Sequence, residues 1–157
     1  MVEILDGETS LAFTVTNGGG AWTFTAGTLA AGAHSITGRA RDAAGNLSAA
    51  PAALSFTIDT TLPTFTAATA PGDTTTVNAI FSEAVYTTAS GGGDLITADF
   101  TVSALTVNGI THTGGQTTAA LALSGGATAD VTTVTLGGSA VFDAAGNAAG
   151  TDPVTVT

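Results

Sequence analysis

Lysine and cysteine are absent from this 157-residue sequence, and its only basic residues, Arg39 and Arg41, stand against twelve acidic ones. The formal net charge is -10 at pH 7, so the chain has too little positive charge to neutralise the phosphates of a nucleic acid. Anionic lipid headgroups repel such a chain as well. We therefore expect neither nucleic acid nor membranes as partners, and a cation is the natural counter-charge.

Without cysteine the chain forms no disulfide framework. Histidine occurs only at His34 and His112, one in each half of the chain, so a zinc or copper site is not expected. His34 is predicted to be an ordinary packed strand residue. No apolar run approaches the roughly 20 residues that span a bilayer, and Met1 leads directly into a strand pattern without a signal peptide. We expect a soluble excerpt of a longer protein.

Aromatic residues are few, whereas glycine, threonine and alanine are abundant, which favours many short strands joined by turns. One turn sequence occurs twice, as Asp42-Ala43-Ala44-Gly45-Asn46 and as Asp143-Ala144-Ala145-Gly146-Asn147. Glycine between Asp and Asn favours a tight turn between strands. A stiff Thr-Thr-Leu-Pro link ends at Pro63. The repeat predicts two domains, residues 1–61 and 62–157.

In the first domain, Leu11, Phe13 and Val15 share one face of a predicted strand. Trp22 and Phe24 point inward from the next, so the two strands are predicted to form a hairpin with the tryptophan in the core. About five strands fit into roughly sixty residues, fewer than the seven of a complete sandwich. We expect the first sandwich to lack its opening strands and to expose an edge.

The second domain contains seven or eight predicted strands with turns every eight to twelve residues, which is typical of a β-sandwich. They are expected near residues 64–66, 77–81, 100–105, 106–112, 118–123, 131–136, 140–142 and 154–156. The predicted fold class is therefore all-β, with two tandem Ig-like Greek-key sandwiches.

Several segments resemble the bacterial Ig-like repeats of large secreted adhesins and biofilm proteins, which type I systems export. They are the segments Trp22–Thr25, Gly32–Thr37, Asp42–Asn46 and Phe56–Pro63. More loosely, the segment Phe81–Val85 and the second copy of the turn resemble a related class from surface-layer proteins. The resemblance implies spacer modules outside a bacterial cell, secreted or on its surface, with neighbouring Ig-like domains of the same parent chain as partners. It also implies calcium at the joints.

Strand length indicates which residues would hold that calcium. A strand rises about 3.3 Å per residue, so Asp42 and Asp59 are expected at opposite ends of the first domain. Asp59, Glu83, Asp143 and Asn147 are then expected to converge where the second domain begins, and to offer the oxygen ligands that calcium prefers. Asp42 and Asn46 would face a preceding domain. Asp and Asn beside glycine are also favoured in turns that bind no metal, so both interpretations stay open.

We expect no enzyme. The serines lack a nucleophile elbow, and the glycine runs at 18–20 and 91–93 lack the lysine of a phosphate-binding loop.

Three functions remain from different classes. The first is a spacer module of an adhesin or surface-layer protein, stiffened by calcium. The second is a self-assembling filament or lattice subunit, whose incomplete first sandwich accepts a strand from another copy. The third is a carbohydrate-binding module that uses the loop at Gly91–Asp94, with Trp22 or Tyr86 as stacking surfaces.

Overall fold

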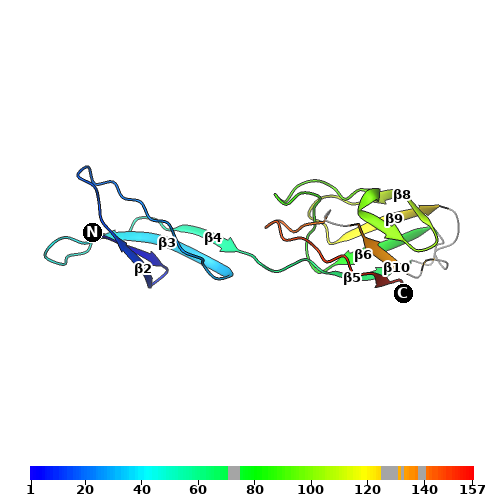
Figure 1. Cartoon of the computed structure of the whole chain (residues 1–157), viewed down its shortest axis with the longest axis horizontal. Helices are drawn as coiled ribbons and strands as arrows, with labels where there is room; N and C mark the ends of the chain where they lie inside the picture. The colour runs from blue at the N-terminus through cyan, green and yellow to red at the C-terminus, as the bar shows by residue number, and fades with distance from the viewer. Residues whose placement is uncertain (71–74, 125–130, 132, 138–140) are drawn as a thin grey trace. The chain divides into compact units, whose positions relative to one another are not determined.

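The computed structural model describes residues 1–70, 75–124, 131, 133–137 and 141–157. Within these ranges the regular elements are β-strands and one three-residue 3-10 helix, η1 (Thr97–Asp99). The predicted all-β class is confirmed. The same ranges hold no helix with the length and apolar character needed to cross a bilayer. The chain divides into two compact units, Met1–Asp59 (unit 1) and Thr60–Thr157 (unit 2) (Figure 1).

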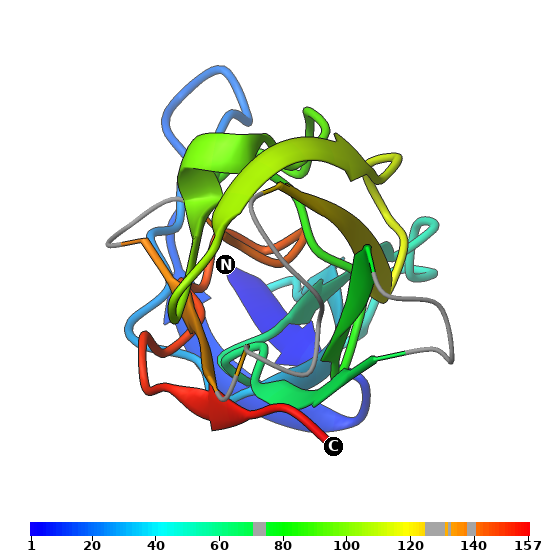
Figure 2. The ribbon, with the colours of Figure 1, turned by 90° about the vertical axis from the view of Figure 1, so that its right-hand side faces the viewer.

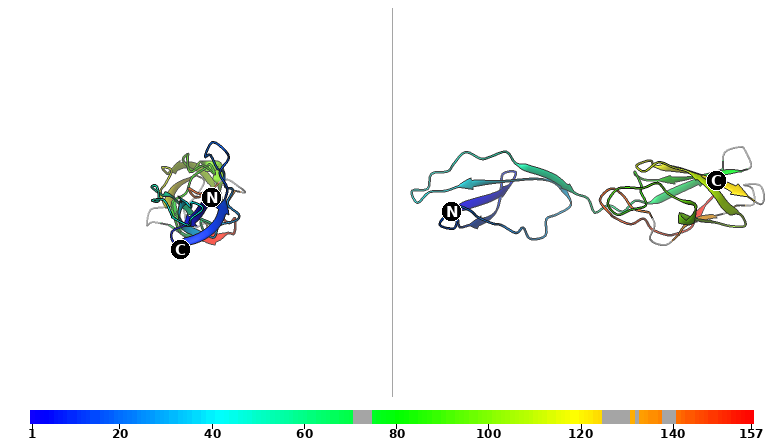
Figure 3. Two further views of the ribbon diagram at one scale, coloured as in Figure 1. Left: turned by 90° about the vertical axis from the view of Figure 1, so that its left-hand side faces the viewer. Right: turned by 90° about the horizontal axis from the view of Figure 1, so that it is seen from above.

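Unit 1 is built on one antiparallel sheet, whose strands are coloured blue to cyan in Figure 3. Its strands are β1 (Val2–Asp6), β2 (Thr9–Thr14), β3 (Gly32–Ala40) and β4 (Leu54–Ile58), in the spatial order β2-β1-β3-β4. Gly7, at a φ of 58°, makes the tight turn between β1 and β2. The register pairs Gly32 with Ile58, so Asp42 and Asp59 follow opposite ends of the β3–β4 pair, as predicted.

The predicted hairpin of residues 11–16 with residues 22–25 is wrong. Strand β2 pairs with β1, and residues 22–25 form no strand. Trp22 is 44% exposed and does not lie in a closed core. Its ring lies 3.6 Å from where a Cβ on Gly38 would stand, so the segment rests on the sheet with no described strand beside it. A strand needs a hydrogen-bonding neighbour, and periodicity alone could not show that this neighbour is missing.

Unit 1 consequently exposes much of its apolar surface. In its described residues, the buried large apolar side chains are those of Val2, Ile4 and Leu5. Seven large apolar side chains are exposed: Met1, Phe13, Val15, Trp22, Leu47, Leu54 and Phe56. The prediction of an incomplete first sandwich agrees with this single sheet. An edge strand such as β4, with Leu54 67% exposed, is open to pairing with another strand.

Unit 2 is a sandwich of two antiparallel sheets. One has the order β5-β6-β9-β8 and the other the order β11-β10-β7. The strands are β5 (Phe65–Thr69), β6 (Thr76–Phe81), β7 (Phe100–Val102), β8 (Thr106–Thr111), β9 (Thr118–Ser124), β10 (Thr133–Leu136) and β11 (Val154–Thr155). All seven coincide with predicted strands. The predicted turn at residues 71–73 and the first residue of the predicted strand at 140–142 lie outside the described residues. In the described part of that segment, Phe142 makes isolated bridges with Tyr86 and Ala148 and no strand forms.

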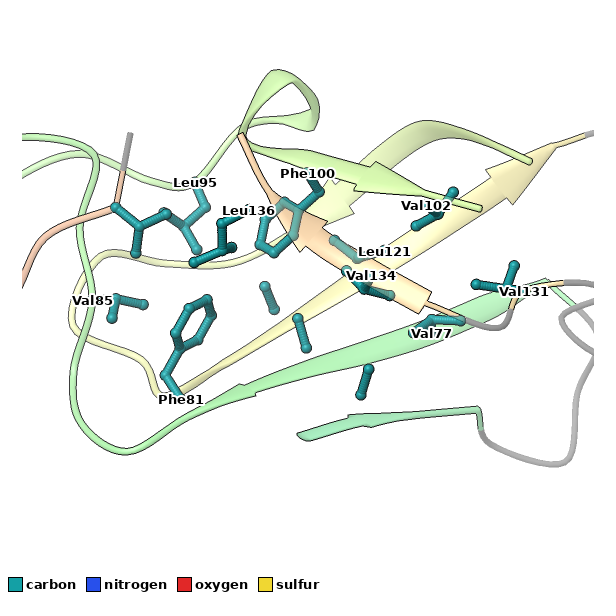
Figure 4. Close-up of a cluster of buried hydrophobic side chains, with 14 of the residues drawn as sticks. Val77, Phe81, Val85, Leu95, Phe100, Val102, Leu121, Val131, Val134 and Leu136 are labelled. Carbon is teal, nitrogen blue, oxygen red and sulfur yellow. The ribbon is translucent and has the colours of Figure 1, made fainter. Parts of the chain in front are cut away.

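A continuous hydrophobic core holds the two sheets of unit 2 together. Alternation along β6 and β9 turns Val77, Phe81 and Leu121 inward, where they meet Phe100 and Val134 of the opposite sheet (Figure 4). Strands of both layers surround this interior when unit 2 faces the viewer (Figure 2). The rings of Phe81 and Phe100 make an edge-on contact, with centroids 6.5 Å apart.

Removing Leu121 tests this core. The side chain is 0% exposed, so Leu121→Ala is expected to lower the free energy of unfolding of unit 2 by about 2–5 kcal/mol. Leu54→Ala, at an exposed position of unit 1, is the matched control and is expected to change stability by less than about 0.5 kcal/mol. Urea denaturation followed by circular dichroism measures both. Equal effects of the two variants would contradict the described core.

Candidate cation site

The two copies of the repeated turn fold in the same way. In the first, the Oδ1 atom of Asp42 accepts the backbone N–H groups of Ala44 and Asn46 at 2.9 and 2.8 Å. The Nδ2 atom of Asn46 donates to the Oδ2 atom of Asp42 at 2.8 Å. Gly45 has a φ of 95°, in the left-handed region that favours glycine. The carboxylate thus reinforces a turn that backbone hydrogen bonds also close, from the N–H of Asp42 to the carbonyl oxygen of Asn46 at 3.1 Å and from the N–H of Gly45 to that of Asp42 at 3.2 Å.

In the second copy, the Oδ1 atom of Asp143 accepts the N–H groups of Ala145 and Asn147, both at 2.8 Å. The Nδ2 atom of Asn147 donates to the Oδ2 atom of Asp143 at 2.7 Å. Gly146 has a φ of 94°. Identical sequence therefore gives identical local structure at two places, as local hydrogen bonding by Asp and Asn side chains predicts.

Two further turns share this geometry, and sequence analysis did not identify them. The Oδ1 atom of Asn17 accepts the N–H groups of Gly19 and Ala21, and the Oγ1 atom of Thr88 accepts the N–H of Gly92. Both loops carry glycine three residues after the accepting side chain, at Gly20 and Gly91, again with positive φ. The shared spacing is an oxygen-bearing side chain followed by glycine three positions later. A comparison of identical sequences finds only the two Asp copies, so it did not predict this wider pattern.

The surroundings of the two Asp turns differ sharply. The turn at Asp42 is exposed, whereas Asp143 is 1% exposed. In unit 2 the loop after Tyr86 covers the turn: Tyr86 and Phe142 exchange backbone hydrogen bonds of 2.8 and 2.9 Å. A Cβ on Gly146 would stand 2.6 Å from the carbonyl oxygen of Ala89. Glycine is thus required there for space as well as for its φ.

The buried carboxyl of Asp143 keeps its negative charge. Burial acts to raise its pKa, but the hydrogen bonds from the side chain and backbone of Asn147, and from the backbone of Gly146 and Ala145, outweigh burial and lower the pKa below 3.8. The Asn46 side chain and backbone likewise lower the pKa of Asp42. Asp143 is therefore a buried anion at neutral pH.

The segment entering unit 2 is anchored beside this turn. The Nδ2 atom of Asn147 also donates to the carbonyl oxygen of Thr61, at 3.2 Å. The side chain of Pro63 is fully buried, and Thr64 exchanges hydrogen bonds of 2.9 Å with Ser82. The Thr-Thr-Leu-Pro segment is thus part of unit 2. Thr61 was not among the predicted site residues, because a backbone carbonyl leaves no signal in sequence.

Three carboxylates converge at this point. Asp59, one peptide bond before unit 2, Glu83 just after β6, and Asp143 each offer an oxygen, and these oxygens lie within 4.8 Å of one another. Asp59 is exposed, Glu83 is half-buried and Asp143 is buried. Three negative charges so close repel one another. A cation among them would relieve that repulsion.

The donor set fits calcium. Calcium–oxygen distances of about 2.3–2.6 Å place two ligands of one ion at most about 5 Å apart, which the three oxygens satisfy. An ionised carboxylate has about four acceptor sites, and Asp143 uses three for the N–H groups of Ala145 and Asn147 and for the Asn147 amide. One direction is left, so Asp143 fits a single-oxygen ligand.

The other predicted metal residues are not brought to this cluster. Asp42 and Asn46 lie in the exposed turn of unit 1, and within the described ranges Asp42 belongs to no group of three potential ligands. Asn147 lies at the cluster, with its amide nitrogen directed at Asp143 and Thr61. Metal binding by any of these residues stays a prediction.

The loop predicted to bind carbohydrate is used for packing. A Cβ on Gly91 would stand 3.2 Å from the Cα of Ala144, and one on Gly115 would stand 3.1 Å from the hydroxyl of Tyr86. Asp94 accepts the N–H of Gly114 through its Oδ1 atom at 2.8 Å. Tyr86 therefore lies against glycine backbone, and carbohydrate binding at this loop stays a prediction.

Comparison with known families supports the first unit's class. Residues 1–60 match the family described as bacterial Ig-like domain. That match supports a bacterial Ig-like domain, a structural module commonly found at surfaces. Beyond Thr60, unit 2 lies outside the match, and its two-sheet sandwich shows its all-β fold. No curated protein and no solved structure matches the chain.

Asn147 and Asn46 form a matched pair for mutation. Asn147→Ala removes the side-chain hydrogen bonds to the buried Asp143 and to Thr61, and is expected to destabilise unit 2 by about 1–3 kcal/mol. Asn46→Ala removes only an exposed contact in the same turn, and is expected to cost less than about 0.5 kcal/mol. Native-state amide exchange with chelator present measures the stability of unit 2 through β9 and that of unit 1 through β3. A larger loss for Asn46→Ala would refute the different roles of the two turns.

Proposed function

We propose that this chain is a structural spacer from an extracellular bacterial surface protein of the adhesin or surface-layer kind, and that calcium binds at the carboxylates of Asp59, Glu83 and Asp143. The proposed role is mechanical and involves no catalysis. The proposed location is secreted or on the cell surface, and the proposed partners are neighbouring Ig-like domains of the same parent protein.

The convergence of the three carboxylates carries this proposal. Their separation within 4.8 Å suits one calcium ion, and the family match of residues 1–60 supports a surface module. Asp143 supplies a buried negative charge whose orientation is fixed by three hydrogen bonds. Glu83 contributes a second negative charge from the segment after β6.

Asp59 is the ligand through which calcium binding would have a mechanical effect. The segment after it is already attached to unit 2 through Thr61 and Pro63, and Asp59 is the last residue of unit 1. Calcium would supply positive charge at this point, and the Asp59 carboxylate would then tie the end of unit 1 to the start of unit 2. Stiffening of the connection follows from that tie.

Calcium is expected to stabilise unit 2 against heat. At a free concentration of 100 times the dissociation constant, binding adds about 2.7 kcal/mol, which corresponds to a rise in Tm of roughly 10–20 °C for a unit of this size. Differential scanning calorimetry with calcium and with chelator measures the rise. Equal midpoints in the two conditions would remove the support for the site.

Two variants separate a specific site from general charge effects. Glu83→Gln removes one ligand charge and is expected to abolish most of the calcium-dependent rise. Asp42→Asn removes one charge from the exposed turn of unit 1 and is expected to leave the rise unchanged. If both variants respond alike, calcium acts through net charge alone.

The open sheet of unit 1 favours a second candidate function, strand exchange between copies. Phe13, Val15 and Trp22 are 55%, 77% and 44% exposed, and β2 and β4 are edge strands. Exposed edges recruit strands from other chains. The net charge of -10 opposes such self-association, so we rank it below the spacer.

If copies of the chain exchange strands, the average particle size is expected to grow with protein concentration. Leu54→Lys places a charge on the β4 edge and is expected to abolish that growth. Ile96→Lys alters another exposed apolar side chain, 55% exposed and in unit 2, and is expected to leave that growth intact. Small-angle scattering over a concentration series measures the particle size of the wild type and of both variants. A wild-type chain that stays monomeric throughout would eliminate this function.

A further inference from the structure

The imidazole of His34 bridges two acceptors in unit 1. Its Nδ1 atom lies 2.5 Å from the Oδ2 atom of Asp6, at the end of β1, and its Nε2 atom lies 2.9 Å from the carbonyl oxygen of Ala30, just before β3. The side chain is 9% exposed. Its ring also lies against Phe56 of β4, with centroids 5.5 Å apart. Sequence analysis predicted only a packed strand residue here.

The chemistry of the two acceptors determines the protonation state that this geometry needs. A carboxylate oxygen and a carbonyl oxygen both accept and neither donates. A neutral imidazole has one N–H and one lone pair, so it satisfies only one of them. The other ring nitrogen would then point its lone pair at an oxygen. Both contacts are made only when the ring carries two N–H groups and a positive charge.

Asp6 is itself held in its charged form. Its Oδ1 atom accepts the N–H of Ser35 at 2.7 Å. This bond, followed by the one from His34, lowers the pKa of Asp6 below 3.8. The carboxylate therefore remains an anion through the range in which histidine titrates, and it faces the ring throughout.

Among the described residues, Asp6 is the titratable side chain found in contact with His34. β4 and the segment 27–31 contain no acidic or basic residue. Along β3 itself, Arg39 is paired in register with Glu3 of β1, five residues from His34. Glu8 lies in the exposed β1–β2 turn region. Asp6 is thus the charged group that faces His34, and the remaining contacts are neutral.

We propose that His34 is a pH-sensitive clamp that, when positively charged, fastens the segment before β3 to the end of β1. The charged ring holds Asp6 on one side and the carbonyl of Ala30 on the other. When the ring loses a proton, the N–H facing the carboxylate is the one kept, because a charged acceptor forms the stronger bond. The contact with Ala30 is lost.

The pH range follows from the sign of the shift. The hydrogen bond to Asp6, and then the one to Ala30, raise the pKa of His34 above 6.5. Stabilisation by the clamp is therefore complete below pH 6.5 and is lost as the pH rises through the folded-state pKa. The segment released is the one that leads from Trp22 to β3, which rests on the open face of unit 1.

Nitrogen-15 and amide NMR of the full chain over pH 5.5–9 tests the clamp. At pH 6 both ring nitrogens of His34 are expected to be protonated. The amides of residues 29–31 are expected to shift with the same midpoint as the ring, above pH 6.5. His112 serves as an internal reference, because its Nδ1 atom accepts the N–H of Leu95 within unit 2 and it takes no part in the proposed clamp.

Asp6→Asn adds a variant test, since it removes the facing charge while keeping the size of the side chain. The clamp predicts a lower His34 midpoint, with the amides of 29–31 following it. A neutral His34 ring at pH 6, or amides of 29–31 that do not follow the ring in the wild-type chain, would overturn the proposal. The wild-type titration decides the matter even if the variant fails to fold.

Discussion

The start of unit 2 is organised around the buried carboxylate of Asp143. Asp143 is almost inaccessible to solvent and ionised, and it holds its charge because three N–H groups of its own turn point at it. The partner that completes this arrangement, Asn147, also holds the carbonyl of Thr61. One side chain therefore links the turn to the entering segment. The gathering of Asp59 and Glu83 at the same point adds negative charge where charge is already buried, which is the physical reason to expect a cation.

The same turn sequence has different surroundings in the two units. At Asp42 it is an exposed connection between strands, and its glycine has open space around it apart from the Arg41 side chain. At Asp143 the loop around Ala89 covers it, and the sandwich is closed by a core drawn from both sheets. Unit 1 has a single sheet with its apolar side chains exposed. The five residues of the Asp-Ala-Ala-Gly-Asn sequence thus determine the local turn structure. The burial of the turn, and the effect of burial on the Asp carboxylate, depend on the segments that pack against it.

Much of the fold could be predicted from the sequence, because alternation along a strand and glycine in a turn are local signals. The seven strands found in the described residues of unit 2 follow from that alternation. The failure at Trp22 is equally physical: residues 22–25 have the pattern of a strand, but a strand also needs a neighbour, and alternation carries no information about neighbours. Strand length and direction were enough to bring Asp59, Glu83 and Asp143 together. The role of Thr61 and the bridging geometry of His34 depend on backbone carbonyls, which sequence does not mark.

Carbon-13 NMR of the side-chain carboxyl groups during a calcium titration tests the central claim most directly, because it observes the proposed ligands themselves. The account predicts that the carboxyl carbons of Asp59, Glu83 and Asp143 shift together and saturate at one calcium per chain. The carboxyl of Asp42, in the same turn sequence but in no group of three potential ligands among the described residues, is predicted to stay unchanged. Unmoved signals from Asp59, Glu83 and Asp143, or an equal response from Asp42, would contradict a cation site at the start of unit 2.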